Sequence, residues 1–177
     1  MNRTSTLLFG VLLLAGAAYA QTDMPKPGPE VKRLDYFTGH WMSEADVKPG
    51  PMGPGGKYHS DDRSEWMEGG FFVVLHSKFS GAGFPPGSST AYMGYDPQEK
   101  VYTYDAFDSM GEATHSKGSV EGDTWTWLND MKEGPQTMKG RFTMKILSPT
   151  EYSYKYEASS DGTKWTILME GKETKQK

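Results

Sequence analysis

Cysteine is absent from the 177 residues, which excludes disulfide scaffolds, thiol enzymes, zinc–thiolate sites and iron–sulfur centres. Basic residues are in the minority: 19 Lys and Arg stand against 23 Asp and Glu, which argues against a nucleic-acid partner. Histidine is scarce, and none of the four pairs with another at metal-ligand spacing. We therefore expect no metal site and no nucleic-acid binding.

Long apolar runs are also missing, apart from one near the N-terminus. Leu7 to Ala18 is apolar except for two glycines, it follows Arg3, and Ala18-Tyr19-Ala20 has the small-x-small form of a cleavage site. A run this short favours a secretory signal peptide over a membrane span. We predict that residues 1–20 are removed and that the protein is exported, periplasmic or extracellular, with no membrane span in the mature chain.

What the chain does contain is β-forming residues with frequent turns. Aromatic residues make up 13% of the sequence, and 21 glycines and 11 prolines separate the apolar runs. Residues 21–29 read as a polar lead-in, and Glu30 to Phe37 as a short helical turn with one apolar side. From Trp41 the period changes to two, which is typical of a half-buried strand.

Turn signals then recur every 11 to 16 residues, which leaves no room for crossover helices. We predict Pro49 to Gly56 and Ser80 to Gly87 as loops, and ten strands at 41–48, 58–67, 71–79, 90–95, 101–107, 112–120, 124–129, 137–147, 151–158 and 164–174. Closure removes exposed edges, so residues 30–177 are predicted to form one all-β domain, a ten-stranded antiparallel up-and-down barrel. A split two-sheet sandwich is the competing architecture.

A barrel of ten strands has space for a small ligand, and alternation predicts its lining. Tyr152, Tyr154 and Tyr156 point inward on the ninth strand, and Trp165, Ile167 and Met169 do so on the tenth. The candidate ligand-binding residues are Trp41, Tyr58, Asp62, Trp66, His76, Tyr104, Trp125, Trp127, Phe142, Tyr154 and Trp165. The alternative is that these side chains pack on one another and leave no cavity.

Three functions fit these observations. The leading hypothesis is an exported barrel that binds a small apolar or aromatic ligand in its lumen without catalysis, because no catalytic motif is present. The second is an isomerase or hydrolase of a small substrate that uses Asp62 or His76 as a base. The third is an envelope protein-interaction module that contacts its partner through the two predicted loops.

Several motifs resemble known families. Gly39-x-Trp41 after a short helical turn resembles the lipocalin/calycin opening, where the Trp closes one end of the barrel. The partner Arg that this family carries on its last strand is missing here, and Lys164 and Lys172 are the basic residues that could take its place. A closer resemblance, to the bacterial domain of unknown function 1579 family, implies a lipocalin-like barrel, often secreted, with no assigned activity. It is carried by residues 34–41 (LDYFTGHW), 48–53 (KPGPMG), 65–69 (EWMEG), 93–96 (MGYD), 122–127 (GDTWTW) and 169–171 (MEG).

Nitrobindin-like haem proteins are also ten-stranded barrels, and they hold the haem iron through a histidine late in the chain. In this sequence no histidine follows His115, so that ligand cannot be carried over. We therefore expect no haem and no other cofactor, with Met or Tyr ligation of a haem as the alternative.

Overall fold

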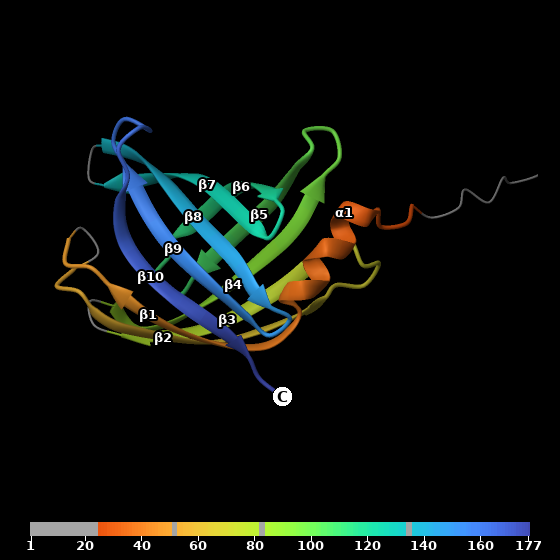
Figure 1. The fold of residues 1–177 in the computed structure, drawn as a ribbon, viewed down its shortest axis with the longest axis horizontal. Helices are drawn as coiled ribbons and strands as arrows, with labels where there is room; N and C mark the ends of the chain where they lie inside the picture. The colour runs from red at the N-terminus through yellow and green to blue at the C-terminus, as the bar shows by residue number, and fades with distance from the viewer. Residues whose placement is uncertain (1–24, 51–52, 82–83, 134–135) are drawn as a thin grey trace, which may run out of the picture.

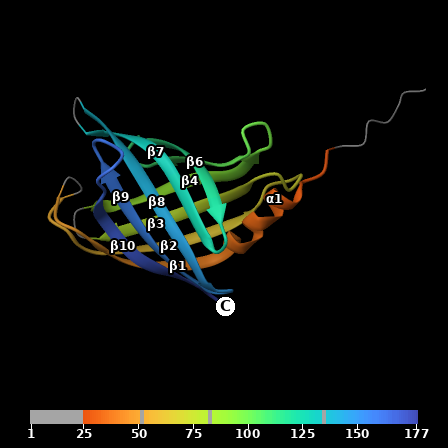
Figure 2. The same cartoon turned by 45° about the horizontal axis from the view of Figure 1, so that its top comes forward.

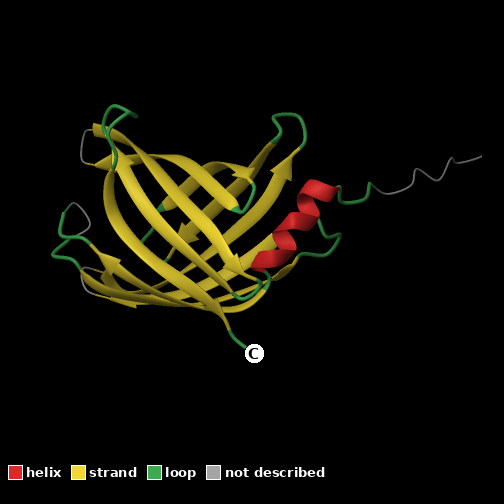
Figure 3. Cartoon of the chain, viewed as in Figure 1, coloured by secondary structure: helices red, strands yellow, loops and turns green. Residues whose placement is uncertain are grey.

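The computed structural model describes residues 25–50, 53–81, 84–133 and 136–177, and the predicted signal peptide lies outside them. The chain forms a short helical segment followed by a closed antiparallel barrel of ten strands (Figures 1 and 3). The elements are α1 Pro29–Lys32, η1 Arg33–Phe37, β1 Gly39–Val47, β2 Gly56–Trp66, β3 Val73–Gly81, β4 Phe84–Asp96, β5 Val101–Asp108, β6 Ala113–Glu121, β7 Thr124–Glu133, β8 Gln136–Ser148, β9 Glu151–Ser159 and β10 Thr166–Lys175.

Closure comes from pairing between the first and last strands. β1 pairs antiparallel with β10 from Trp41 opposite Lys175 to Val47 opposite Met169, and every other strand pairs with its neighbours in sequence. No sheet edge is left among the paired strands, since closure satisfies both sides of each strand. The predicted barrel is confirmed, and the sandwich alternative is excluded.

One predicted loop is partly strand. β4 begins at Phe84, so residues 84–87 of the predicted Ser80 to Gly87 loop belong to the sheet. The sequence prediction followed Pro85 and Pro86, which cannot donate to a ladder. Here the β3–β4 register shifts between Phe79, which faces Gly87, and Gly81, which faces Phe84. Such an irregularity accommodates prolines because the ladder does not need their missing N–H groups.

The helical segment closes one end of the barrel, as Figures 1 and 2 show. Val31, Leu34 and Phe37 are buried, and each contributes roughly 1.5–3 kcal/mol of apolar burial. The Tyr36 hydroxyl lies 2.9 Å from the carbonyl oxygen of Ser148, the last residue of β8. α1 has only four residues, and no helix in the described part of the chain is long and apolar enough to cross a membrane.

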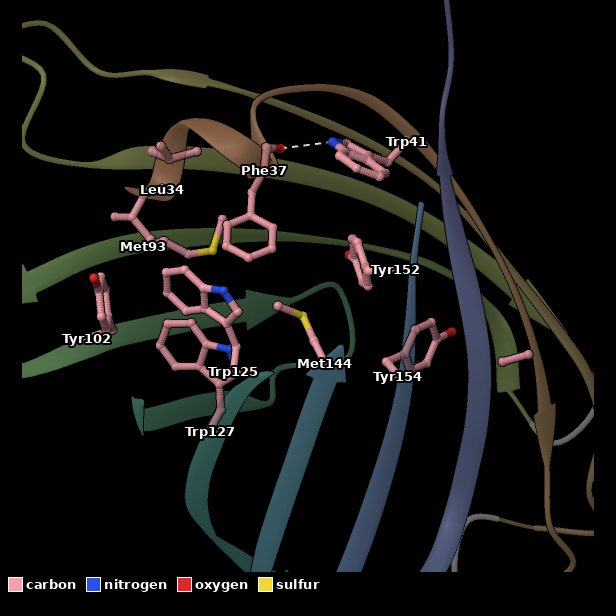
Figure 4. Close-up of a cluster of buried hydrophobic side chains, with 12 residues drawn as sticks. Leu34, Phe37, Trp41, Met93, Tyr102, Trp125, Trp127, Met144, Tyr152 and Tyr154 are labelled. Atoms are coloured by element: carbon pink, nitrogen blue, oxygen red, sulfur yellow. Dashed lines mark hydrogen bonds between the residues drawn. The ribbon is translucent and has the colours of Figure 1, made fainter. Parts of the chain in front are cut away.

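An aromatic core fills the barrel beneath this segment (Figure 4). The indole N–H of Trp41 donates to the carbonyl oxygen of Phe37 at 3.1 Å, which ties β1 to the end of η1. Trp125 and Trp127 stack on one another from β7, with ring centroids 6.2 Å apart, and Phe37 meets Trp125 edge-on. The hydrophobic side chains are therefore concentrated at the plugged end, and the cavity begins beside them.

Candidate functional site

The barrel lumen contains a cavity with two adjoining lobes of about 310 and 290 Å³. The first lobe lies next to the aromatic core, and the second extends toward the opposite end, where β5 and β6 meet at Asp108 and Glu112. Six residues line both lobes: Asp62, Leu75, Tyr104, Thr114, Phe142 and Glu173. The alternative of a solidly packed interior is therefore wrong.

Two carboxylic acids stand where the lobes meet. Asp62 comes from β2 and Glu173 from β10, the two strands that flank β1. On the inner face Asp62 is opposite Trp41, and Ser43, two residues further along β1, is opposite Glu173. The strand pairing thus brings the two carboxyl groups to one wall of the cavity from positions 111 residues apart in the sequence.

Neutral hydroxyl groups surround both acids. Ser60 donates to Oδ2 of Asp62 at 2.7 Å, and Ser77 on β3 also hydrogen-bonds this carboxylate. The Tyr152 hydroxyl donates to Oε2 of Glu173. Asp62 is 6% exposed, so its charge is removed from bulk water. Hydroxyl donors stabilise a buried carboxylate, but they supply no opposite charge.

The electrostatics of the pair follow from this burial. Burial first, and then the charge of Asp62, raise the pKa of Glu173 from 4.5 to about 8. Burial also raises the pKa of Asp62, while the hydrogen bonds from Ser77, Ser60 and Glu173 oppose that rise. Within the described residues no Lys, Arg or His forms an ion pair with either acid. The site therefore favours a shared proton at neutral pH.

Tyrosine hydroxyls complete the polar part of the lining. Burial raises the pKa of Tyr58, Tyr104 and Tyr154, and the charges of the two acids add to the effect. The hydroxyl oxygens of Tyr154 and Ser43 lie 2.6 Å apart. These phenols stay protonated at neutral pH, so they can donate hydrogen bonds to a carboxylate or to a ligand.

Most of the predicted ligand-binding residues meet at this cavity. Those that line at least one lobe are Trp41, Tyr58, Asp62, Tyr104, Trp127, Phe142 and Tyr154. Trp66 and Trp125 are elsewhere in the barrel. The Trp66 indole donates to Oδ1 of Asp35 at 2.9 Å, and Trp125 is buried in the core behind Trp127.

His76 and Trp165 correct the sequence analysis. His76 is exposed on the outer face of β3, where Nδ1 lies 3.1 Å from the Thr90 hydroxyl, because its neighbour Ser77 takes the inward position opposite Asp62. The structure therefore does not bring His76 and Asp62 together as an acid–base pair.

Trp165 lies outside the lumen because β10 carries an irregularity. The register with β9 shifts between Ile167 and Met169, so Met169 points inward as predicted, but Ile167 does not. Trp165 precedes the strand and stacks on the Arg141 guanidinium, 4.0 Å from its ring centroid. An extra residue in a strand exchanges the inward and outward faces of the residues that precede it. Only the residues from Met169 onward therefore face the way that the sequence predicted.

Glu173 is the residue that the sequence analysis missed. Alternation continued from Met169 would have placed Gly171 and Glu173 inside, so the signal was present. The same parity places Lys175 inside, and its ammonium lies 5.3 Å from the Trp41 ring centroid. Lys175 is neither of the two basic residues, Lys164 and Lys172, that the sequence analysis named, and Lys172 pairs instead with Glu151.

The residue types present limit the chemistry of this site. No group of three or more His, Asp or Glu in the described part of the chain could hold a metal ion. Two acids, a set of phenols and an aromatic wall can instead bind a hydrogen-bond donor and hold or release a proton.

The chain is similar to two solved structures. The chain is similar to the crystal structure of Rv2717c from M. tuberculosis, with a TM-score of 0.57 and 14% identity over 85% of this chain and 99% of that one. It is also similar to a de novo designed fluorescence-activating β-barrel, with a TM-score of 0.44 and 12% identity over 81% of this chain and 96% of that one. At these identities the likeness to Rv2717c concerns the fold alone.

Sequence comparison is more specific than structural likeness. Residues 26–175 match the family described as a protein of unknown function, DUF1579. This match covers the helical segment and all ten strands, and it includes both Asp62 and Glu173. The chain belongs to the DUF1579 family.

Proposed function

We propose that the protein is an exported barrel that binds a small, largely apolar or aromatic molecule in its lumen. The observation that carries this proposal is the cavity itself, whose larger lobe measures about 310 Å³. Small-molecule sites begin at about 300 Å³ and combine apolar walls with a few placed polar groups. The lobes of this lumen adjoin at Asp62 and Glu173, so one ligand can extend from the first lobe into the second.

The walls indicate the kind of ligand. Trp127, Tyr104 and Phe142 present aromatic surface to the cavity, and Met93 and Met144 border the same lobe. Aromatic rings favour stacked or edge-on contacts with other rings, and methionine adapts its shape to irregular ligands. A flat apolar molecule would gain both kinds of contact while it displaces water from the lumen.

A neutral fluorescent dye and a cavity-filling variant test this proposal. Thr114 on β6 borders both lobes, and Thr114→Phe places a ring in the space between them. We expect wild-type protein to bind N-phenyl-1-naphthylamine saturably, with emission enhanced, and Thr114→Phe to weaken binding by at least about tenfold, or about 1.4 kcal/mol.

The matched control is Ser119→Phe, because Ser119 is exposed on the outer face of the same strand. This variant should bind the dye as the wild type does. Equal binding by Thr114→Phe and the wild type would locate the dye outside the lumen and contradict the proposal.

Export is the second part of the proposal and is supported by the sequence of residues 1–20. If the full chain is expressed in a bacterial host, the protein recovered from the periplasm should begin at Gln21 by intact mass. Recovery of the uncleaved chain from the cytoplasm alone would contradict this part and leave the lumen proposal unaffected.

A further inference from the structure

We propose that the ligand of this lumen is a small organic cation, an amine with an apolar or aromatic body, whose ammonium group binds between Asp62 and Glu173. The inference rests on the proposed function and specifies its ligand class. Three features carry it: the position of both acids on one cavity wall, the absence of a compensating charge among the described residues, and the aromatic surface opposite them.

The charge balance of the site is incomplete. Asp62 and Glu173 line both lobes and hydrogen-bond one another, and their other side-chain donors, Ser60, Ser77 and Tyr152, are all neutral. A buried carboxylate without a cation is costly, and the cost falls when an ammonium group donates to it. In the described residues no side chain does so, but a ligand held between the lobes could.

Lys175 is a cation on the inner face of β10, close to Glu173 in the sequence. It follows Glu173 by two residues on β10, but its ammonium lies over the Trp41 ring and its side chain packs beside Gly39. No effect of Lys175 on the pKa of Asp62 or Glu173 is among the causes of their shifts. The Lys175 ammonium therefore interacts with the Trp41 ring, and the two acids are available to another cation.

The aromatic walls suit the same ligand. Cations are attracted to the faces of aromatic rings, and quaternary and other ammonium ligands are recognised in this way. The chain's own cations already use this interaction, since Lys175 lies over Trp41 and Arg33 over Trp125. Trp127 faces the cavity, and within the described residues no cation lies over its ring. An ammonium ligand can fill that position.

This arrangement predicts the direction of the pH dependence. Four phenols face Asp62 and Glu173 in the cavity: Tyr58, Tyr104, Tyr152 and Tyr154. The other titratable groups of the lining are Asp108 and Glu112, at the far end of the second lobe. The phenols remain neutral, so the acids decide the charge. Amine affinity should rise as pH increases through the range where Glu173 loses its proton, and binding below that range should release a proton.

Titration calorimetry with a matched pair of probes tests the inference. We expect 2-phenylethylamine, which is protonated at pH 8, to bind at least about tenfold more tightly than neutral 2-phenylethanol, because a hydrogen bond to a charged group is worth one to two decades of affinity. Asp62→Asn and Glu173→Gln should each reduce this preference severalfold while the alcohol binds as before. Glu65→Gln, an acid-to-amide substitution on the exposed outer face of β2, should leave it unchanged.

The outcomes separate the two proposals. If the neutral dye binds in the lumen but amine and alcohol bind equally, the lumen function stands and the cation inference is overturned. If the amine preference persists in both acid variants, the ammonium binds elsewhere and the inference is also overturned. Circular dichroism and dye binding by each variant establish that it is folded, so a lost preference reports on charge and not on unfolding.

Discussion

Glu173→Gln provides a direct test of the buried acid, because it changes the pH dependence of stability. In the folded protein burial and the nearby Asp62 charge hold the pKa of Glu173 at about 8, compared with 4.5 in its ordinary state. Between these values the folded protein keeps a proton that the unfolded chain has released. The resulting stability is fully present below pH 4.5 and is lost as the pH rises through 8.

The size of the effect follows from the same two values. Each pH unit between them costs about 1.4 kcal/mol, so the wild type should lose up to about 5 kcal/mol through this group between pH 4.5 and pH 8. A glutamine at this position has no proton to retain. Asp62 remains in the variant and contributes a decline of the same sign, so the variant's profile is shallower than that of the wild type but not flat.

Urea denaturation at pH values from 5 to 9, followed by circular dichroism, measures this difference. The gap between Glu173→Gln and the wild type should widen in favour of the variant as pH rises. Glu170→Gln is the control, because Glu170 is exposed on the outer face of β10 and pairs with Lys48. If the free energies of unfolding of wild type and Glu173→Gln run parallel across this range, the buried-acid reasoning is refuted.

Two further substitutions test the closure of the barrel, with unfolding free energy as the measurement. A Cβ on Gly171 would lie 2.4 Å from the carbonyl oxygen of Glu44 on β1, so Gly171→Ala should lower the free energy of unfolding by about 1–3 kcal/mol. Gly50→Ala is the control, because no atom lies within 4 Å of the added Cβ, and it should change the free energy of unfolding little. Trp41→Phe removes the indole donor to Phe37 from a side chain that is 2% exposed and should cost about 1–3 kcal/mol; a loss below about 0.5 kcal/mol would show that this bond does not secure the plug.

The sequence was sufficient to predict the ten-stranded meander, because turn residues separate the strands at nearly regular intervals. It also predicted the inner position of Asp62, since the alternation on β2 continues without interruption from Tyr58 to Trp66. A strand with an unbroken period of two has only two orientations, and the more charged face takes the solvent side.

Where the period is interrupted, prediction failed. The register shift between Ile167 and Met169 reverses the face of the residues before it, so Trp165 was assigned to the lumen. Glu173 lies after the shift, where the alternation is regular, and it was overlooked because the inward assignment stopped at Met169. The short apolar stretch on β3 gave no alternation from which to orient His76. Pro85 and Pro86 concealed the start of β4 in the same way, because a bulge that tolerates proline depends on the partner strand and not on local sequence.

Local sequence patterns do not predict that Asp62 and Glu173 lie close together. Each acid is placed by its own strand, but their proximity requires β1 to lie between β2 and β10, which is a consequence of closure. The register across β1 then decides that both face one cavity wall. Sequence periodicity contains neither piece of information.

Native mass spectrometry of the protein purified gently from its own host tests the central claim most directly. The account predicts a retained small molecule on the wild type, released on activation and absent from Thr114→Phe, with a positive charge at neutral pH if the cation inference holds. A bare protein mass for the wild type, or the same adduct on wild type and Thr114→Phe, would contradict the claim that the lumen is the binding site.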